Sequence, residues 1–247
     1  MITRVLAVGL VAGLISGICI AVVQVFTTTP LILQAEAFEG APAHQAHVGS
    51  PIVRALATTA PPAVVLIHAE HGDHAAWAPE DGFERALYTG VATIGTAVGF
   101  ALLLVAGMLA VGDPISERRA VGWASAAFVA TGLAPAMGLP PELPGMAAAD
   151  LVSRQQWWIM TAVATAAALW MLLRSDAFWL HLLAVVLLLA PHVIGAPHLS
   201  EALPSTVPAE LAARFTATSL AVQASLWVLT GYLVGVLWPR LGEPNVA

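Results

Sequence analysis

The sequence predicts an all-α integral membrane protein in which about six transmembrane helices form three hairpin-like repeats with outer loops broken by proline and glycine. Hydrophobic residues make up 59% of the chain and charged residues only 10%, whereas roughly a quarter of the residues in soluble domains are charged. A two-helix pattern also occurs twice. Because apolar runs occupy most of the 247 residues, we expect a single membrane domain over residues 1–247.

Six apolar runs are the predicted transmembrane helices. They cover residues 5–27, 87–111, 121–136, 157–173, 178–194 and 216–238. A helix needs about 20 apolar residues to cross the hydrocarbon core, and the first, second and last runs provide them. The three shorter runs can cross where the bilayer thins or where flanking arginines reach the interface. The first run is longer than a signal-peptide core and no small-residue cleavage site follows it, so we expect an uncleaved anchor.

The repeated pattern covers residues 133–157 and 189–227. In each copy an apolar helix ends in Leu-Ala-Pro, a Gly-x-Pro turn follows, and an acidic residue lies four positions before an arginine that opens the next helix. We interpret this as a duplicated helical hairpin. The first hairpin is then the most diverged copy, with Thr29-Pro30 in place of Leu-Ala-Pro and a long loop at residues 28–86.

Each outer loop ends with an acidic residue and an arginine. The pairs are Glu84 with Arg85, Asp150 with Arg154, and Glu210 with Arg214. In the last two pairs the spacing of four allows an ion pair on one helix face, and the acid at the helix start complements the helix dipole. The plainer alternative is that these arginines only anchor helix ends at the membrane interface.

Small residues spaced by four predict close helix contacts in lipid. They form three series, which are Gly9, Gly13 and Gly17, then Gly95 and Gly99, then Gly231 and Gly235. Helix packing is the better interpretation of all three.

The arginines predict the orientation in the membrane. With both termini in the cytoplasm, the short inner turns carry closely spaced basic residues, as the positive-inside rule favours. The inner arginines are then Arg4, Arg118, Arg119, Arg174 and Arg240, and the outer ones are Arg54, Arg85, Arg154 and Arg214. The loop at 28–86 is extracytoplasmic in this arrangement. The outer face holds most of the acids and histidines, so it attracts cations.

No Asp, Glu or Arg lies at mid-depth in the six runs, so a cation path through this chain would use neutral ligands and backbone carbonyls. The polar side chains in or near the runs include Gln24, Thr93, Thr96, Thr131, Thr161, Thr165, Gln223 and Thr230. Proline-broken backbone can supply carbonyls where it lines a cavity. The segment 138–145, which contains Pro140 and Pro141, cannot continue a helix and is the main candidate.

The outer loop contains a possible metal-collecting stretch. His68, His71 and His74 recur every third residue, with acidic residues between them. Neutral imidazole with carboxylate suits Co, Ni, Zn and Cu. The alternative is a merely solvated polar loop.

We call the two proline- and glycine-containing turns, at residues 138–145 and 191–197, the first and second breakers. The stronger candidates for metal ligands lie at the second breaker. They are His192, His198 and Glu201, around Gly195 and Pro197. Both breakers end their helices on the same side of the membrane, so we expect Glu142 and His192 to share an outer vestibule, with His198 and Glu201 near its rim. A carboxylate and an imidazole suit a borderline divalent cation. The alternative for His192 is a helix-end histidine bonded to a carbonyl.

Composition argues against other classes of function. The net charge is −6 and the chain has no lysine, which excludes a basic nucleic-acid footprint. A single cysteine, Cys19, excludes an internal disulfide and a Cys-cluster metal site. No phosphate-binding G-x-x-x-x-G-K-[ST] run and no opposed histidines for haem occur. We therefore expect neither an enzyme nor a resident cofactor.

Several stretches carry a resemblance to a known family. They are TPLI at 29–32, AEAFE at 35–39, the His-rich loop, WAP at 77–79, GFER at 82–85, the Leu-Ala-Pro to Leu-Pro-Gly segment at 133–145, and PHVIGAP at 191–197. In this order they resemble the CbtA family of predicted cobalt transporter subunits over nearly the whole chain.

The resemblance implies a bacterial inner-membrane protein that takes up cobalt for cobalamin synthesis with a small His-bearing CbtB partner. It implies functional positions at Glu36, Glu39, Arg85, Glu142, Arg154, His192 and Arg214. We count the three glutamates and His192 among the candidate metal ligands, and the three arginines, with the breaker prolines and Gly195, as structural or gating residues. An accessory or assembly subunit without a path of its own is the alternative.

Overall fold

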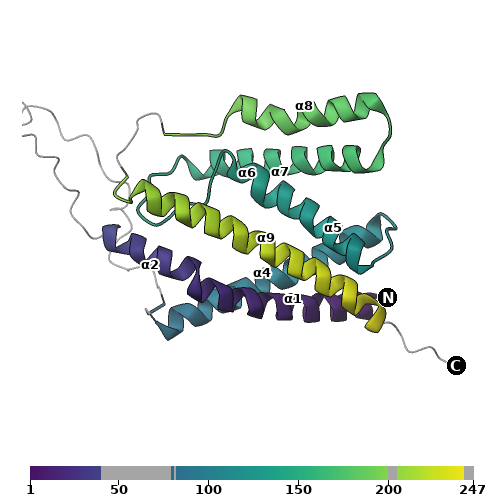
Figure 1. The fold of residues 1–247 in the computed structure, drawn as a ribbon, viewed down its shortest axis with the longest axis horizontal. Helices are drawn as coiled ribbons and strands as arrows, with labels where there is room; N and C mark the ends of the chain where they lie inside the picture. Colours follow the sequence, from purple (N-terminus) through teal and green to yellow (C-terminus); the bar gives the residue numbers. More distant parts are fainter. Residues whose placement is uncertain (40–78, 81, 200–204, 242–247) are drawn as a thin grey trace, which may run out of the picture.

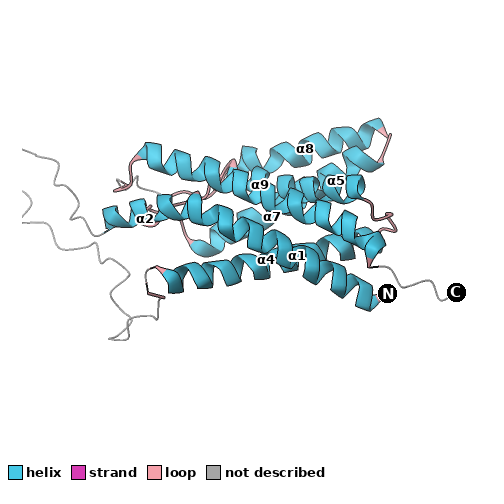
Figure 2. Cartoon of the chain, turned by 60° about the horizontal axis from the view of Figure 1, so that its bottom comes forward, coloured by secondary structure: helices cyan, strands magenta, loops and turns pink. Residues whose placement is uncertain are grey.

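A computed structural model describes residues 1–39, 79–80, 82–199 and 205–241. All the secondary structure in this described part is helical (Figure 2). The helices form an elongated bundle, and α1 begins at the same end at which α9 (Ala209–Arg240) finishes (Figure 1). We call this the N-terminal end. The opposite end holds the proline-rich segment 137–150, and we call it the breaker end.

The first part of the bundle is a close contact between α1 (Ile2–Phe26) and α4 (Phe83–Ala110). Gly9, Gly13 and Gly17 form the contact face of α1. A Cβ added to Gly13 would lie 2.6 Å from the backbone nitrogen of Val98, so the two helices meet backbone to backbone. Small residues allow this approach in lipid, where no hydrophobic effect drives helices together. The predicted packing role of this glycine series is confirmed.

The other two glycine series differ from each other. Gly231 and Gly235 of α9 face the start of α5 (Glu117–Phe128), and a Cβ on Gly235 would lie 2.6 Å from the backbone nitrogen of Glu117. In contrast, a Cβ on Gly95 or Gly99 would meet nothing within 4 Å. The predicted close contact at Gly95 and Gly99 is therefore wrong for the described chain, because that face of α4 points away from the neighbouring helices.

Helix α5 continues through a π turn, η1 (Val129–Leu133), into the short α6 (Ala134–Ala136). The N–H of Ala134 bonds to the carbonyl of Val129, five residues back. Pro135 causes this widening, because it has no N–H for the carbonyl of Thr131 and its ring crowds that carbonyl. π turns are rare and are frequently found at functional sites.

The last helices pack differently from the predicted hairpins. Helix α8 (Phe178–Ile194) lies against α7 (Leu151–Arg174), whereas α9 packs on α5 and α1 (Figure 1). The predicted third hairpin is therefore not a packed pair, because the glycine face of α9 fits the small residues at the start of α5. The repeat arrangement as a whole stays a prediction.

The outer loop predicted at 28–86 begins with a helix, α2 (Thr28–Glu39). Pro30 lies in its first turn, where proline costs little because the N–H there has no helical partner. Leu31 and Ala35 of α2 are buried in a cluster with Leu143 and Phe215. Residues 28–39 are thus a packed helix, and this corrects the expectation of loop.

Among the described residues, four helices are long and apolar enough to cross a membrane, namely α1, α4, α7 and α9. Helix α8 is apolar but shorter, with 17 residues. The predicted run at 121–136 corresponds to the helix interrupted by η1. Helix α7 begins at Leu151, six residues before the predicted start at 157, because Asp150 caps it with a hydrogen bond from the Ser153 N–H.

Candidate functional site

The two predicted breakers meet around Trp157 at the breaker end. Trp157 of α7 is buried, and its indole Nε1 donates a hydrogen bond to the carbonyl of Pro191 at 3.3 Å. A Cβ added to Gly138 would lie 2.8 Å from the Trp157 ring and 2.9 Å from the Cβ of Ala196. Only glycine fits there without displacing the ring, so the first breaker, the second breaker and the start of α7 form one packed unit.

The second breaker places its two described histidines differently. His192 is half-buried, and its ring lies edge-on to Trp157 with centroids 6.0 Å apart. Gly195 ends α8 with φ of 85°, a conformation that glycine adopts without strain. Pro197 follows, and His198 is exposed. Glu201 lies outside the described residues.

A cavity of about 580 Å³ opens beside this unit. It lies among the first breaker, η1, α7 and α9, and most of its lining is apolar. The polar side chains in its wall are those of Thr131, Glu142, Arg154, Gln155 and Gln223. A few converging polar groups in a largely apolar cavity are typical of a binding site. We call this cavity the vestibule.

An ion pair between Glu142 and Arg154 crosses the vestibule wall. The Arg154 Nη2 lies 2.6 Å from the Glu142 Oε2, and both side chains are about one-quarter exposed, at 26% and 25%. The carboxylate is therefore neutralised in this state, rather than free to attract a cation. The Nε of Arg154 is buried and has no hydrogen-bond partner, so this guanidinium is only partly satisfied.

Asp150 does not form the predicted pair with Arg154. Its carboxylate accepts hydrogen bonds from the backbone N–H and the hydroxyl of Ser153, each at 2.9 Å. These bonds, led by the one from the backbone, lower the pKa of Asp150. The acid is used as a helix cap, which leaves Arg154 for Glu142. Glu210 and Arg214 are exposed and form no ion pair with each other in the described chain.

A second ion pair has the same arrangement. Arg85, in the first turn of α4, donates to Glu36 of α2, with its Nη1 2.8 Å from the Glu36 Oε2. Both side chains are a little over one-quarter exposed. In each case a glutamate after a helix break holds an arginine from the start of the returning helix. Glu84, the predicted neighbour of Arg85, instead accepts a hydrogen bond from the backbone N–H of Glu80.

The inner wall of the vestibule is the π turn and α9. The amide oxygen of Gln223 lies 2.6 Å from where a Cβ on Gly132 would be, so the Gln223 side chain contacts the backbone of the π turn. Thr216 of α9 donates a hydrogen bond to the carbonyl of Pro141 at 3.1 Å. Gln223 and Thr131 thus bring neutral side-chain oxygens to the residues that line the cavity.

Comparison with protein families identifies the chain. Residues 2–239 match the family described as "Probable cobalt transporter subunit (CbtA)". The chain belongs to the CbtA family. No curated protein and no solved structure matches it.

Membership of the CbtA family and the four long apolar helices make the chain a multi-pass membrane protein. The family description indicates a cobalt transporter subunit, and a subunit implies a membrane complex with other chains. The family also indicates a role other than catalysis.

The predicted metal ligands of this CbtA chain are not gathered in one place. Within the residues that the structure describes, no three His, Cys, Asp or Glu side chains lie close enough to hold a metal ion. His192 does not line the vestibule with Glu142. His68, His71, His74 and Glu201, with the side chain of Glu39, lie outside the described part. Their roles stay predictions.

Sequence reasoning missed two parts of the site. The π turn has only a weak signal, a glycine and a proline close together near the end of an apolar run. Gln155 looks like an ordinary polar residue at a helix start. It lies in a cavity wall only because the first breaker, η1 and α9 enclose a cavity beside the start of α7. Gln223 and Thr131 could be found, because polar side chains are few in these apolar runs.

Proposed function

We propose that this chain forms the outer part of a cobalt path in a bacterial inner-membrane uptake transporter that supplies cobalamin synthesis. The observation that carries the proposal is the vestibule, whose wall contains the paired carboxylate of Glu142 and the neutral side chains of Gln223 and Thr131. The chain has no ATP-binding motif, so the energy comes from the membrane potential or another subunit. A small His-bearing membrane subunit is the expected partner.

The proposed topology has six crossings with both termini in the cytoplasm. Two features support it. Helix α1 begins and helix α9 ends at the same end of the bundle (Figure 1). A chain that begins and ends on one side of a membrane crosses it an even number of times. Helix α8 has 17 residues and is about 26 Å long at 1.5 Å per residue, close to the roughly 30 Å hydrocarbon core.

The Glu142–Arg154 ion pair lets the vestibule bind a cation only when one arrives. Without a cation, the arginine neutralises the carboxylate, so the vestibule has no net negative charge. A hydrated Co²⁺ ion would compete with Arg154 for the carboxylate. Displacing the arginine exposes one fixed negative charge, which offsets part of the cost of removing water from the ion. Gln223, Thr131 and carbonyls released by the prolines would then accept the ion as neutral oxygen ligands.

Uptake kinetics in cells test this mechanism. Glu142→Gln should lower the maximal rate of cobalt uptake by about tenfold or more, since contacts to charged groups are typically worth about 1.5–3 kcal/mol. Arg154→Gln should instead lower the cobalt concentration for half-maximal uptake, because the competitor for the carboxylate is gone. Glu210→Gln is the matched control, an exposed acid at the same end. Normal uptake by both vestibule variants would contradict the proposal.

The His-rich loop serves a different step in this proposal. A loop that collects metal raises its local concentration and leaves the barrier to crossing unchanged. Replacing His68, His71 and His74 should therefore weaken uptake at limiting cobalt and spare it at saturating cobalt. Loss at saturating cobalt would show that the loop belongs to the path.

An accessory subunit is the second candidate, favoured by the scarcity of gathered metal ligands in the described chain. The two functions differ in where the path lies. Under the accessory function, vestibule variants change the amount of assembled complex and not its rate per complex. Measuring complex abundance beside uptake separates the two.

A further inference from the structure

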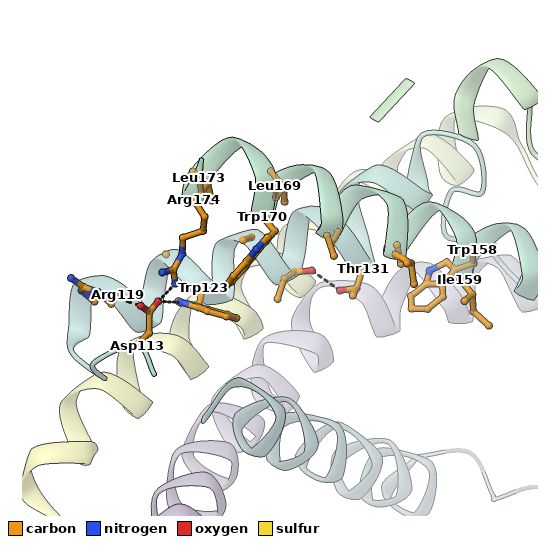
Figure 3. Close-up of a pocket in the computed structure, with 17 residues that line it drawn as sticks. Asp113, Arg119, Trp123, Thr131, Trp158, Ile159, Leu169, Trp170, Leu173 and Arg174 are labelled. Carbon is orange, nitrogen blue, oxygen red and sulfur yellow. Dashed lines mark hydrogen bonds and ion pairs between the residues drawn. The ribbon is translucent and has the colours of Figure 1, made fainter. Parts of the chain in front are cut away.

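A second, larger cavity lies between α5–η1 and α7 (Figure 3) and meets the vestibule wall at Thr131, Trp158 and Ile159. Its volume is about 830 Å³, within the range of roughly 300–1,000 Å³ that ligand sites occupy. The walls are mainly small or apolar side chains, with Gly122, Ala126 and Ala130 spaced by four on one side and Ala162 and Ala166 on the other. We call it the groove.

The groove is open space in the described chain. A Cβ added to Gly122 would meet nothing within 4 Å. Large apolar side chains border it along its length, including Trp158, Ile159 and Leu169, which Figure 3 shows along α7. An apolar groove of this length on the side of a membrane bundle faces hydrocarbon chains.

The groove ends in charge at the N-terminal end of the bundle. Asp113 accepts a hydrogen bond from the Trp123 indole at 2.8 Å and pairs with both Arg174 and Arg119, the latter at 3.4 Å (Figure 3). One carboxylate thus faces two guanidinium groups, which leaves one net positive charge. The arginine side chains are 54% exposed for Arg119 and 37% for Arg174. Each guanidinium has five N–H donors, so donors remain for a second anion.

The surroundings reinforce this positive charge. The described arginines at the N-terminal end are Arg4, Arg118, Arg119, Arg174 and Arg240, against the acids Asp113, Glu117 and Asp176. Trp123 and Trp170 lie at the charged end of the groove, with ring centroids 6.0 Å apart. Tryptophan is enriched where hydrocarbon meets headgroups, and basic pockets between transmembrane helices bind acidic lipid headgroups.

We propose that the groove binds an anionic phospholipid, with its phosphate on Arg119 and Arg174 and an acyl chain along Gly122, Ala126 and Ala166. The small walls alone would also suit a transmembrane helix. An anionic lipid uses both features of the groove, the apolar walls and the net positive charge at the end. The groove adjoins the vestibule at Thr131, Trp158 and Ile159, which line both cavities. Its charged end with Arg119 and Arg174 lies outside the vestibule, and lipid binding there does not depend on the cobalt path.

Native mass spectrometry of the full-length purified chain tests the site. The protein is given equal amounts of phosphatidylglycerol and phosphatidylcholine with identical acyl chains. We expect phosphatidylglycerol to be retained about fivefold more, as one net basic charge near a membrane surface provides. Arg119→Gln with Arg174→Gln should remove this preference. Arg118→Gln with Arg240→Gln is the control, because it removes the same charge at the same end outside the groove wall.

A second variant keeps the charges and fills the space. Gly122→Leu should abolish retention of the lipid, whereas Gly99→Leu, at an equally open helical glycine on α4, should leave it unchanged. Equal retention of the two lipids, or a preference that survives Gly122→Leu, would overturn the proposal. So would a bound second polypeptide that Gly122→Leu releases, since the groove would then be a protein interface.

Discussion

Glu36 and Glu142 each hold an arginine from the first turn of the following long helix. The sequence marks all four residues, yet it predicts the wrong partners for both arginines. A spacing of four on one helix suggested Asp150 for Arg154, and Glu84 was grouped with Arg85 only because it precedes that arginine directly. The folded chain uses these nearer acids in backbone hydrogen bonds, and the arginines pair with glutamates 12 and 49 positions away. Such distant pairs depend on where the helices break, which residue spacing does not encode.

Asp113 provides a prediction on pH at this scale. The hydrogen bond from Trp123, followed by Arg174 and Arg119, holds the pKa of Asp113 below its ordinary value of 3.8. A carboxyl with a lowered folded pKa stabilises the fold fully above 3.8 and loses that contribution as the pH falls through the folded value. Asp113→Asn should therefore lower the melting temperature at pH 7, with a difference that shrinks below pH 3.8.

Thermal unfolding in detergent across this pH range measures the effect. Asp176→Asn, at an exposed acid near the same end, is the control and should change little. A difference between wild type and Asp113→Asn that is constant from pH 7 to pH 3 would contradict the assignment.

At the scale of elements, hydrophobic length predicts the long helices well. Runs of about 20 apolar residues gave α1, α4 and α9 because a membrane leaves few alternatives for such segments. Helix α2 was missed because proline and a short apolar stretch resemble a loop. The π turn was missed because its cause, Pro135, also ends helices in other contexts.

The contact between α1 and α4 predicts that alanine substitutions at two glycines will have different effects on stability. Gly13→Ala places a methyl group against the backbone of Val98, and such overpacking typically costs about 1–3 kcal/mol. Gly95→Ala adds the same methyl group in open space and should be neutral or stabilising, because alanine favours helix by about 1 kcal/mol over glycine. Unfolding in mixed micelles compares the two. Equal destabilisation by both variants would show that α1 and α4 do not meet as described.

At the scale of the whole molecule, the order of helices along the chain predicts only part of the packing. The first two runs pack together as α1 and α4, but the last two do not, because α9 passes beside α1 and α5 while α8 lies on α7. Small residues on both partners decide which helices pack closely in a membrane. A glycine series in the sequence predicts a close contact, but it does not identify the partner helix. The excess of arginines at the N-terminal end could be predicted from the sequence. Successive helices run in opposite directions across the membrane, so the position of each arginine in the sequence decides at which end it lies.

Membrane orientation follows from that asymmetry. In a background with Cys19→Ser, a cysteine at exposed Ala148 should react with a membrane-impermeant maleimide added to intact cells. A cysteine at exposed Arg118 should react only after the membrane is opened. The opposite pattern would reverse the topology, and labelling of both in intact cells would contradict a position of the bundle across the membrane.

The most direct test of the cobalt path is flux into proteoliposomes that contain this chain with the other transporter subunits. The account predicts that flux requires this chain and that Glu142→Gln lowers the maximal rate at saturating cobalt by about tenfold or more, with equal protein inserted. Full flux from the other subunits alone, or an unchanged maximal rate in the variant, would contradict it.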